Sequence, residues 1–386
     1  MTSSNKKFAI IGAGIGGLTL AIAMQQKGFD VTVYENAPQI KPLGAGLGLA
    51  ANAMKAFYEI GIGDRILKAG KKLKSLEIKS RAGKVLSSAD SEKMAKNLGV
   101  TSNFAIHRAD LHEVLLHEVK PGTLQLGKGC LDFVQSEMGV TIKFSDGTSS
   151  FADYMIAADG INSKVRSKLL PDSNPRYAGY TCWRAVIDSI DDFDLETTSE
   201  TWGEEGRFGI VPLSDNRIYW FACINAPQND LSKKAFTIKD LQNRFQYYHS
   251  PIPRLLSMTN ESQLIWSDII DLKPLRKFAF GRVVLIGDAA HATTPNMGQG
   301  ACMAIEDAVI LANLLETSTS AEEVFKLFEK KRIVRTTKIV NGSWRVGKLA
   351  QMDNSFLIGL RNAALQVTPS SVAEKQMKFI SDISFS

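Results

Sequence analysis

The sequence predicts a mixed α/β protein that combines a parallel sheet covered by helices with a second, mostly antiparallel sheet. The first indication is a strand, a glycine-rich turn, a helix and another strand between residues 8 and 35. The second is a pair of apolar strands, 154–158 and 282–286, that each end beside an aspartate and a glycine. The third is a pair of strand-like runs, 207–213 and 217–224, separated by Ser-Asp-Asn, which is a hairpin-type turn.

Length and composition indicate a globular protein of more than one domain. The 386 residues allow two or three domains, at roughly 100 to 200 residues each. The chain is 44% hydrophobic and 22% charged, which fits neither a disordered chain nor an integral membrane protein. The 46 Lys and Arg exceed the 40 Asp and Glu by only 6, so the charge gives no indication of a nucleic-acid partner. The longest apolar runs are far shorter than the roughly 20 residues of a spanning helix, so we expect no transmembrane segment.

Cysteine usage predicts a cytoplasmic protein. The sequence has no C-x-x-C pair, and its first residues lack the apolar core of a signal peptide. The four cysteines lie far apart, at Cys130, Cys182, Cys223 and Cys302.

Basic residues gather in two stretches, 65–84 and 326–348, the second within a predicted helix. Charge runs of this kind usually form solvated faces, so we expect these side chains in solvent rather than in a polyanion site. Those of the helix include Lys330, Lys331, Arg332, Arg335 and Lys338.

The N-terminal unit carries a dinucleotide-binding pattern. An apolar strand, Phe8–Ile11, precedes Gly12-Ala-Gly14-Ile-Gly-Gly17 and a helix. In such a unit Gly12 permits the tight turn, Gly14 lets the backbone approach a pyrophosphate, and Gly17 allows close packing of the helix on the strand. The phosphates would meet the helix N-terminus, where unpaired N–H groups stabilise negative charge.

Glu35 ends the second strand of this unit and can accept both hydroxyls of an adenosine ribose. The pattern alone does not distinguish FAD from NAD. A second glycine-rich loop, 41–48, precedes a predicted helix near 51–60, where a third strand and helix of an NAD dehydrogenase would usually continue. This loop indicates backbone lying close to a larger ligand.

Two later strands end in carboxylates placed to meet such a ligand. Asp159-Gly160 ends one strand, and Gly287-Asp288 ends the other. Open α/β sheets bind their ligands at the carboxyl ends of their strands. Pro295 and then Gly298-Gln-Gly300 precede another helix, whose N-terminus would stabilise negative charge on a reduced flavin near its N1 and C2 carbonyl.

In this order and spacing, from about residue 6 to residue 365, the motifs resemble those of the class A flavoprotein monooxygenases, which have the para-hydroxybenzoate hydroxylase fold. The glycine turn with Glu35 is similar to the ADP-binding fingerprint of the family, and the two aspartate turns are similar to its Asp-Gly motif, with Arg166, and its Gly-Asp motif. His107–Leu111 resembles the segment whose arginine contacts the flavin. The resemblance implies an FAD site formed by Gly12, Gly14, Gly17, Glu35, Arg108, Asp159, Gly287, Asp288, Pro295, Gly298 and Gly300.

The resemblance also implies the domain organisation. Residues 1–173 and 276–320 would form a discontinuous, Rossmann-like FAD-binding domain. Residues 174–275 would form an inserted substrate domain with a mostly antiparallel sheet. Residues 321–386 would form a helical segment packed on the FAD domain.

Within the family, Thr294–Asp307 and Tyr177–Trp183 are most similar to the branch that holds FAD-dependent urate hydroxylase and zeaxanthin epoxidase. The urate enzyme has an acidic residue where this chain has Asn296, which argues against a purine substrate. By the same resemblance Arg207 and Tyr219 face the substrate pocket, and Met297 lies beside the turn that faces the flavin. These three residues, Arg207, Tyr219 and Met297, are the predicted catalytic set.

The resemblance implies a monooxygenase. NAD(P)H would reduce FAD, dioxygen would add at the flavin C4a, and the hydroperoxide would hydroxylate or epoxidise a small aromatic or olefinic substrate in a dry pocket. NAD(P)H would bind transiently, because a second G-x-G-x-x-G pattern is absent. We expect a monomer or a homodimer. An FAD-dependent reductase of an unsaturated or prenyl substrate and a non-catalytic FAD-binding regulator are the alternatives, and oxygen uptake separates them from a monooxygenase.

Other enzyme classes lack their required residues. Disulfide reductases need a redox cysteine pair, but residues 36–60 contain no cysteine, and the W-x-W-x-I-P signature of flavin halogenases is missing. His107, His112 and His117 are spaced by five and so diverge around a helix, and we expect no metal site. Hydrolysis by a Ser/His/Asp triad lacks its G-x-S-x-G.

Overall fold

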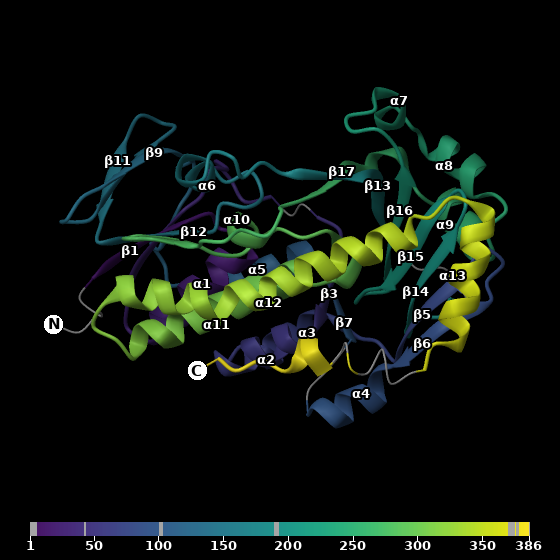
Figure 1. The fold of residues 1–386 in the computed structure, drawn as a ribbon, viewed down its shortest axis with the longest axis horizontal. Coiled ribbons are helices and arrows are strands. Elements are labelled where there is room, and N and C mark those ends of the chain that lie inside the picture. The colour runs from purple at the N-terminus through teal and green to yellow at the C-terminus, as the bar shows by residue number, and fades with distance from the viewer. Residues whose placement is uncertain are drawn as a thin grey trace.

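The computed structural model describes residues 6–41, 44–99, 103–188, 193–369, 375 and 378–385. Figure 1 shows two lobes side by side, and the long helix α12 (Ala321–Ala350) runs from one lobe towards the other. The lobe near the N-terminus contains a parallel sheet with its helices, and the other lobe contains a larger, mostly antiparallel sheet.

The parallel sheet has six strands in the order β18-β19-β12-β1-β2-β8. All neighbours are parallel except the terminal pair β18–β19. The predicted strands are confirmed, with small shifts at their ends. The strands are β1 (Lys7–Ile11), β2 (Asp30–Tyr34), β8 (Leu124–Gln125), β12 (Tyr154–Ala157), β18 (Ala279–Phe280) and β19 (Val283–Leu285).

Helices cover this sheet and enclose its core. The predicted helix after the glycine turn is α1 (Ile15–Gln26), and it packs against α11 (Gly300–Glu316) and α5 (Arg108–Glu118). The helix predicted near 51–60 is α2 (Ala51–Glu59), which also packs on α11. Apolar side chains from the strands and these helices form one continuous core. The parallel sheet is buried on both faces, as such sheets usually are.

Two smaller sheets and two short helices complete this lobe. One three-stranded sheet consists of β9 (Cys130–Gln135), β10 (Val140–Phe144) and β11 (Ser149–Ala152). The other consists of β3 (Gly46–Ala50), β4 (Lys71–Lys72) and β7 (Asn103–His107), and β3 is formed by the second glycine-rich loop. The helices are α3 (Gly63–Ala69) and α6 (Lys164–Leu169).

The second lobe is built on a seven-stranded sheet with the order β17-β13-β16-β15-β14-β5-β6. The predicted hairpin is β15 (Gly206–Pro212) and β16 (Arg217–Asn225). Residues 75–90 supply the edge strands β5 and β6, so the sheet extends beyond the 174–275 segment. The remaining strands are β5 (Ser75–Ser80), β6 (Val85–Asp90), β13 (Arg176–Asp188), β14 (Thr197–Gly203) and β17 (Ile265–Asp271).

The two faces of this sheet differ in what covers them. One face carries a core of buried residues, such as Trp183, Phe208 and Trp220, under α8 (Ile238–Phe245) and α9 (Ile252–Ser257). The opposite face packs against Ala105 of β7 and, through Tyr219, against Gly46 of β3 in the first lobe. It is therefore the face that meets the lobe with the predicted cofactor motifs.

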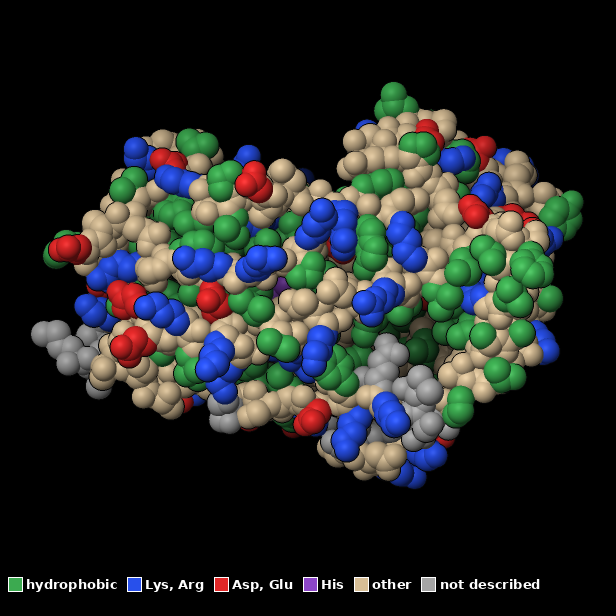
Figure 2. All heavy atoms as spheres, in the orientation of Figure 1, with side chains coloured by type: hydrophobic (Ala, Val, Ile, Leu, Met, Phe, Trp, Pro, Cys, Tyr) green, Lys and Arg blue, Asp and Glu red, His purple; other side chains and the backbone are tan. Residues whose placement is uncertain are grey.

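The C-terminal helices contact both lobes. Helix α12 packs on α11 and β18, whereas α13 (Ser355–Val367) packs beside β6 of the second sheet. Figure 2 shows hydrophobic side chains gathered over α13, where Phe356, Leu360 and Val367 are exposed. The other elements are α4 (Ser91–Leu98), α7 (Leu231–Lys234), α10 (Asp288–His291), η2 (Glu261–Gln263) and η3 (Pro295–Met297). Across the described segments, no helix combines the length and the apolarity needed to cross a bilayer.

Candidate active site

The glycine turn after β1 is shaped by the chain's own packing at its first and third glycines. Gly12 has φ +104°, and a Cβ there would lie 2.5 Å from the carbonyl oxygen of Ala158. A Cβ at Gly17 would collide with the carbonyl oxygen of Gly12. Gly14 is different, because no atom lies within 4 Å of where its Cβ would be. The fold therefore requires the outer two glycines, and open space lies beside Gly14 at the N-terminus of α1.

Glu35 follows β2 and braces this turn from the neighbouring strand. Its Oε2 accepts a 2.8 Å hydrogen bond from Ala13 N, and its Oε1 accepts one of 2.8 Å from Ala37 N. The side chain is half-buried. The carboxylate is thus fixed beside the turn, and it retains acceptor capacity because each of its oxygens can accept more than one hydrogen bond.

The Asp159-Gly160 turn follows β12, next to β1 in the sheet. Asp159 Oδ2 accepts from Val165 N at 3.3 Å, while Oδ1 is buried with no hydrogen-bond partner in the described part of the chain. Burial raises the pKa of this carboxyl above its ordinary value. An orphaned carboxylate oxygen of this kind is uncommon in folded proteins and points to a donor supplied by a ligand or water.

Arg166 joins the two aspartate turns. Its buried guanidinium donates from Nη2 to Ile161 O at 2.6 Å and from Nη1 to Ala289 O at 3.3 Å. The turns are adjacent because β12 pairs with β19, with Ala157 opposite Leu285. Arg166 therefore holds the turn after β12 to the short helix that begins at Asp288.

Asp288 points away from the core at the end of β19. Its side chain is exposed, and a Cβ at Gly300 would lie 4.0 Å from its Oδ1. Partial loss of hydration raises the pKa of this carboxyl, and the charges of His291, Arg108 and Arg166 oppose the rise. Arg108, which is exposed at the start of α5, is therefore close enough to Asp288 to act on it electrostatically.

The turn before α11 brings a second helix N-terminus to the same edge. Gly298 has φ +61° and no atom within 4 Å of its Cβ position, and Gly300 begins the helix. Pro295 and Met297 lie in the 3₁₀ turn just before it. A Cβ at Gly342 would lie 3.1 Å from Met297 Sδ, so this side chain packs against α12. Met297 thus supports the turn from the helix side.

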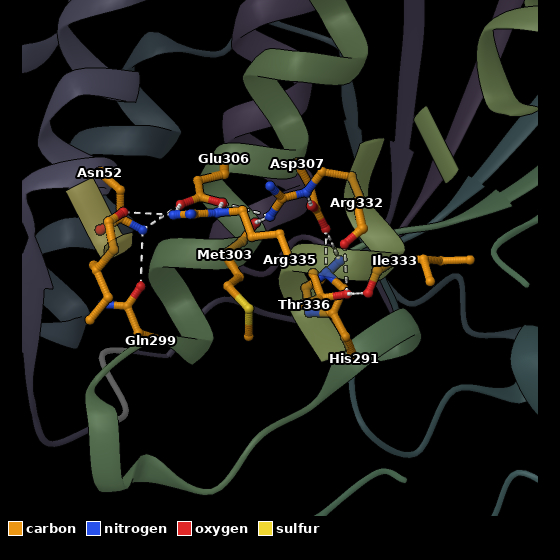
Figure 3. Close-up of polar contacts among 12 residues, drawn as sticks. Asn52, His291, Gln299, Met303, Glu306, Asp307, Arg332, Ile333, Arg335 and Thr336 are labelled. Carbon is orange, nitrogen blue, oxygen red and sulfur yellow. Dashed lines mark hydrogen bonds and ion pairs between the residues drawn. The ribbon is translucent and has the colours of Figure 1, made fainter. Parts of the chain in front are cut away.

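A buried network of charges anchors the Gly287-Asp288 turn (Figure 3). Asp307 Oδ2 accepts from Gly287 N at 2.8 Å and pairs with His291 Nε2 at 2.6 Å. Arg332 Nε donates to Asp307 Oδ1 at 2.5 Å. The network continues to Glu306, which pairs with Arg332, Arg335 and Asn52. It fixes the Gly-Asp turn and α11 to α12.

This network corrects one expectation from the sequence. The basic residues of 326–348 were expected in solvent, but the Arg332 side chain is 1% exposed and that of Arg335 is 11% exposed. They occur at a spacing of three on α12 and face Glu306 and Asp307 of α11. The sequence could not predict these ion pairs, because it does not show that the carboxylates of another helix pack against the basic residues of α12.

The predicted residues therefore fall into two groups. The carboxyl ends of the parallel strands bring Gly12, Glu35, Asp159 and Asp288 to one edge of the six-stranded sheet, with Gly14 and Gly300 at two helix N-termini. Arg207 and Tyr219 lie instead on the other sheet, on the face that meets β3.

Tyr219 is buried at the contact between the two lobes. Its side chain is 8% exposed and lies against Gly46, where a Cβ would be 2.5 Å from Tyr219 Cδ1. Its neighbours on the sheet include Val186, Val211 and Phe221, all half-buried. Burial raises the pKa of Tyr219, and the charge of Arg184 opposes this rise. The hydroxyl therefore stays protonated at neutral pH.

Arg207 is bound within the protein. It is 2% exposed, pairs with Glu200 Oε1 at 3.0 Å and donates from Nε to Gln351 Oε1 at 2.6 Å. Its guanidinium also lies 5.1 Å from the centre of the Tyr180 ring. Burial lowers the pKa of Arg207, but Glu200 outweighs this, so the net shift is upward and the charge is permanent.

Sequence reasoning missed Arg184 and Phe221, which lie opposite each other between Arg207 and Tyr219. The signal was present, because side chains alternate along a strand and Tyr180, Cys182 and Arg184 share one face of β13. What the alternation does not reveal is which face meets the other lobe.

The chain is similar to several known proteins. A family model described as an FAD binding domain matches residues 6–343. The chain is 37% identical over 361 residues to aurachin C monooxygenase/isomerase of Stigmatella aurantiaca, covering 94% of each chain. It is 32% identical over 369 residues to 2-heptyl-3-hydroxy-4(1H)-quinolone synthase of Pseudomonas aeruginosa, again covering 94% of each. The crystal structure of Klebsiella pneumoniae HpxO with FAD and uric acid superposes with a TM-score of 0.89 at 28% identity, covering 98% and 97%.

The described residues fit FAD. Open space lies beside Gly14 and Gly298, Asp159 has a buried oxygen without a partner, and the Asp288 carboxylate is accessible. With the family match over most of its length and relatives above 30% identity, the chain belongs to the class A FAD-dependent monooxygenases.

Proposed function

We propose that this monooxygenase hydroxylates a planar N-heteroaromatic ring of the quinolone type. Relatives that match 94% of the chain are named for aurachin C and for a hydroxyquinolone. The observation that carries the proposal is the half-buried apolar and aromatic surface of Val186, Val211 and Phe221 around Tyr219, at the contact between the lobes. A flat aromatic ring is the ligand that such a surface fits best.

Asn296 supports a substrate other than a purine. Its Nδ2 donates to Thr294 Oγ1 at 2.8 Å and to Ser343 O at 3.0 Å, and its Oδ1 accepts from Tyr180 at 3.0 Å. Both donor positions of the amide are thus used inside the protein. Asn296 therefore holds the 3₁₀ turn to α12 and β13 and offers no carboxylate to a purine N–H.

In the proposal each cofactor-binding residue acts on one part of FAD. The α1 N-terminus at Gly14 holds the pyrophosphate, Glu35 the adenosine ribose and Asp288 the ribityl chain. The α11 N-terminus at Gly298–Gly300 faces the pyrimidine end of the flavin. The contacts described above hold the Glu35 carboxylate and the turns that carry the other groups.

Arg108, Asp159, Gly287 and Pro295 shape or border the same site in the proposal. When bound and reduced by NAD(P)H, FAD supplies the activation of dioxygen. The residues of the second sheet would exclude water and orient the ring. The further proposals are a cytoplasmic location, which agrees with four free cysteines, and a monomeric or homodimeric state.

Oxygen incorporation tests the reaction and the substrate class together. The FAD-loaded protein is given NAD(P)H and, in separate reactions, a 2-alkyl-4-quinolone, uric acid and salicylate. We expect dioxygen uptake and product carrying one labelled oxygen from isotopic dioxygen with the quinolone. Turnover without dioxygen would indicate a reductase, and conversion of uric acid in preference to the quinolone would overturn the proposed substrate class.

Tyr219→Phe tests whether the surface around Tyr219 holds the ring. The variant keeps the aromatic side chain and loses one hydroxyl. We expect normal FAD content but a larger share of dioxygen released as hydrogen peroxide, because a displaced substrate is oxygenated less efficiently. An unchanged ratio of peroxide to product would place the ring elsewhere.

A further inference from the structure

Two arginines lie on the sheet face that meets the other lobe. Cys182 of β13 and Arg207 of β15 both pair with Cys223 of β16, and Arg184 pairs with Phe221. Since residues two apart on a strand share a face, Arg184 lies between the positions of Arg207 and Tyr219. Along β16, Cys223 and Tyr219 are roughly 13 Å apart, so Arg184 is the cation nearer the apolar surface around Tyr219.

The two arginines differ in how their charge is balanced. Arg207 is buried against the carboxylate of Glu200 and the amide of Gln351. Arg184 is half-buried and donates from Nη1 to Ser267 Oγ at 2.8 Å. No carboxylate of the described residues lies within 4.0 Å of it. Arg184 thus has N–H donors that no acidic side chain occupies.

A half-buried guanidinium without a carboxylate is costly, because it loses hydration and gains no opposite charge. Its titratable neighbours are Tyr219, Cys182 and Cys223. Burial raises the pKa of the Cys182 thiol, but the hydrogen bond with Cys223 and the charges of Arg184 and Arg207 lower it to about 7. Cys182 is the neighbour whose thiolate would compete with a substrate oxygen for Arg184, and it can be tested separately.

We propose that Arg184 binds the negatively polarised oxygen of the aromatic substrate and so selects rings that carry such an oxygen. The inference rests on the proposed function and narrows it to rings with a carbonyl, enolate or phenolate oxygen conjugated with the carbon to be hydroxylated. A guanidinium is suited to this task, because its planar donors bind an oxyanion directionally and its charge is permanent. The apolar neighbours Phe221 and Val186 would hold the ring itself.

The binding of the oxygen also has a chemical consequence. A cation at the oxygen favours the deprotonated form of the ring, and that form carries more electron density on its conjugated carbons. The carbon that receives oxygen must be electron-rich. Arg184 would thus favour both binding of the correct ring and its reactive form.

The test compares each substrate with its O-methyl ether, which keeps the ring but blocks the charged oxygen. Wild type and Arg184→Gln are assayed with a 2-alkyl-4-quinolone and the matching 4-methoxyquinoline, and with salicylate and its methyl ether. For whichever ring wild type converts, we expect Arg184→Gln to lower kcat/KM by on the order of 10- to 100-fold. We expect little change with the ether, and partial recovery in Arg184→Lys.

Three controls distinguish a specific role of Arg184 from the loss of any arginine, from a folding defect and from an effect of the Cys182 thiol. Arg345→Gln removes an exposed arginine of α12 and should leave selectivity and FAD content unchanged. FAD absorbance should be normal in Arg184→Gln, which excludes a general defect in folding. Cys182→Ser should retain the preference for the free oxygen, since it removes only the competing thiol.

The outcomes also distinguish this inference from the proposed function. Conversion of salicylate but not of the quinolone, with selectivity lost in Arg184→Gln, would overturn the quinolone proposal and support the role of Arg184. An Arg184→Gln variant that still prefers the free oxygen would overturn the inference, whatever the substrate. Loss of preference in Cys182→Ser would also overturn it, because Arg184 would then serve the thiol. Failure of wild type to convert any of these rings would overturn both.

Discussion

Arg207 Nε donates a 2.6 Å hydrogen bond to Oε1 of Gln351, the residue that caps the C-terminal end of α12. This contact joins the middle of the seven-stranded sheet to the helix that runs along the first lobe. Gln351 in turn donates to Asn225 Oδ1 at 2.8 Å, at the end of β16. Arg207 therefore helps to fix the second lobe to the end of α12.

Arg207→Ala should destabilise the protein. The substitution removes the hydrogen-bond donor to Gln351 Oε1 and the ion-pair partner of the partly exposed Glu200, which we expect to cost about 1–3 kcal/mol in the free energy of unfolding. Urea unfolding of the FAD-loaded protein measures this, with Arg345→Ala as the control. A variant of normal stability whose KM for the substrate rises sharply would show instead that Arg207 binds substrate, as the family resemblance implies.

Gly14→Ala and Gly17→Ala should separate cofactor binding from folding. The first substitution places a methyl group in open space, so we expect a folded protein that holds FAD weakly, because the methyl group lies where the pyrophosphate is proposed to pass. The second drives a methyl group into the Gly12 carbonyl, so we expect loss of soluble protein. Circular dichroism and FAD content of the purified variants give the two readouts. Normal FAD affinity in Gly14→Ala would contradict the proposed pyrophosphate position.

Asp288→Ala should weaken FAD binding without unfolding the chain. The carboxylate is exposed and accepts no hydrogen bond from the described residues, so its removal should not disturb the turn. Loss of one hydrogen bond to the ribityl chain corresponds to a rise of about 5- to 150-fold in the dissociation constant. Titration of the apoprotein with FAD, followed by flavin fluorescence, measures it. An unchanged constant would mean that Asp288 is only a turn residue.

Asp307→Asn should remove part of the acid sensitivity of the fold. Burial alone would raise the pKa of Asp307, but His291 and Arg332 outweigh it and hold the pKa below its ordinary value. A carboxyl with a lowered folded-state pKa stabilises the protein above its unfolded pKa, about 3.9, and this contribution is lost as the pH falls through the folded value. Breaking the buried pairs should cost about 3–5 kcal/mol at neutral pH.

The measurement is urea unfolding of wild type and Asp307→Asn between pH 7 and the acid limit of folding. We expect the difference between the two proteins to be largest at neutral pH and to shrink below pH of about 4. Glu322→Gln changes a more exposed carboxylate of α12 and is the control. A difference that does not vary with pH would show that Asp307 acts through shape rather than charge.

The sequence by itself determined the first lobe and the convergence of most residues of its candidate cofactor site. Strand–turn–helix units are local, and each glycine or aspartate at a strand end occupies a position set by the residues around it. Parallel strands place their carboxyl ends at one edge, so Gly14, Glu35, Asp159 and Asp288 converge without knowledge of any distant contact. The hairpin of β15 and β16 was predictable for the same reason, since Ser-Asp-Asn and the flanking apolar runs are contiguous.

Only the tertiary structure decided which charged side chains have a partner of opposite charge and which are buried. Arg207 and Arg184 look alike in the sequence, yet Arg207 is neutralised by Glu200 and hydrogen-bonded to Gln351, while Arg184 has no carboxylate partner among the described residues. Arg332 looked like a solvated residue of a basic helix, yet it is buried against Asp307. The energy of a charge depends on its distance from opposite charges and from water, and those distances are set by elements far apart in the chain. The sequence therefore identified the cofactor, and the packing of the two lobes decided which arginine has a carboxylate partner.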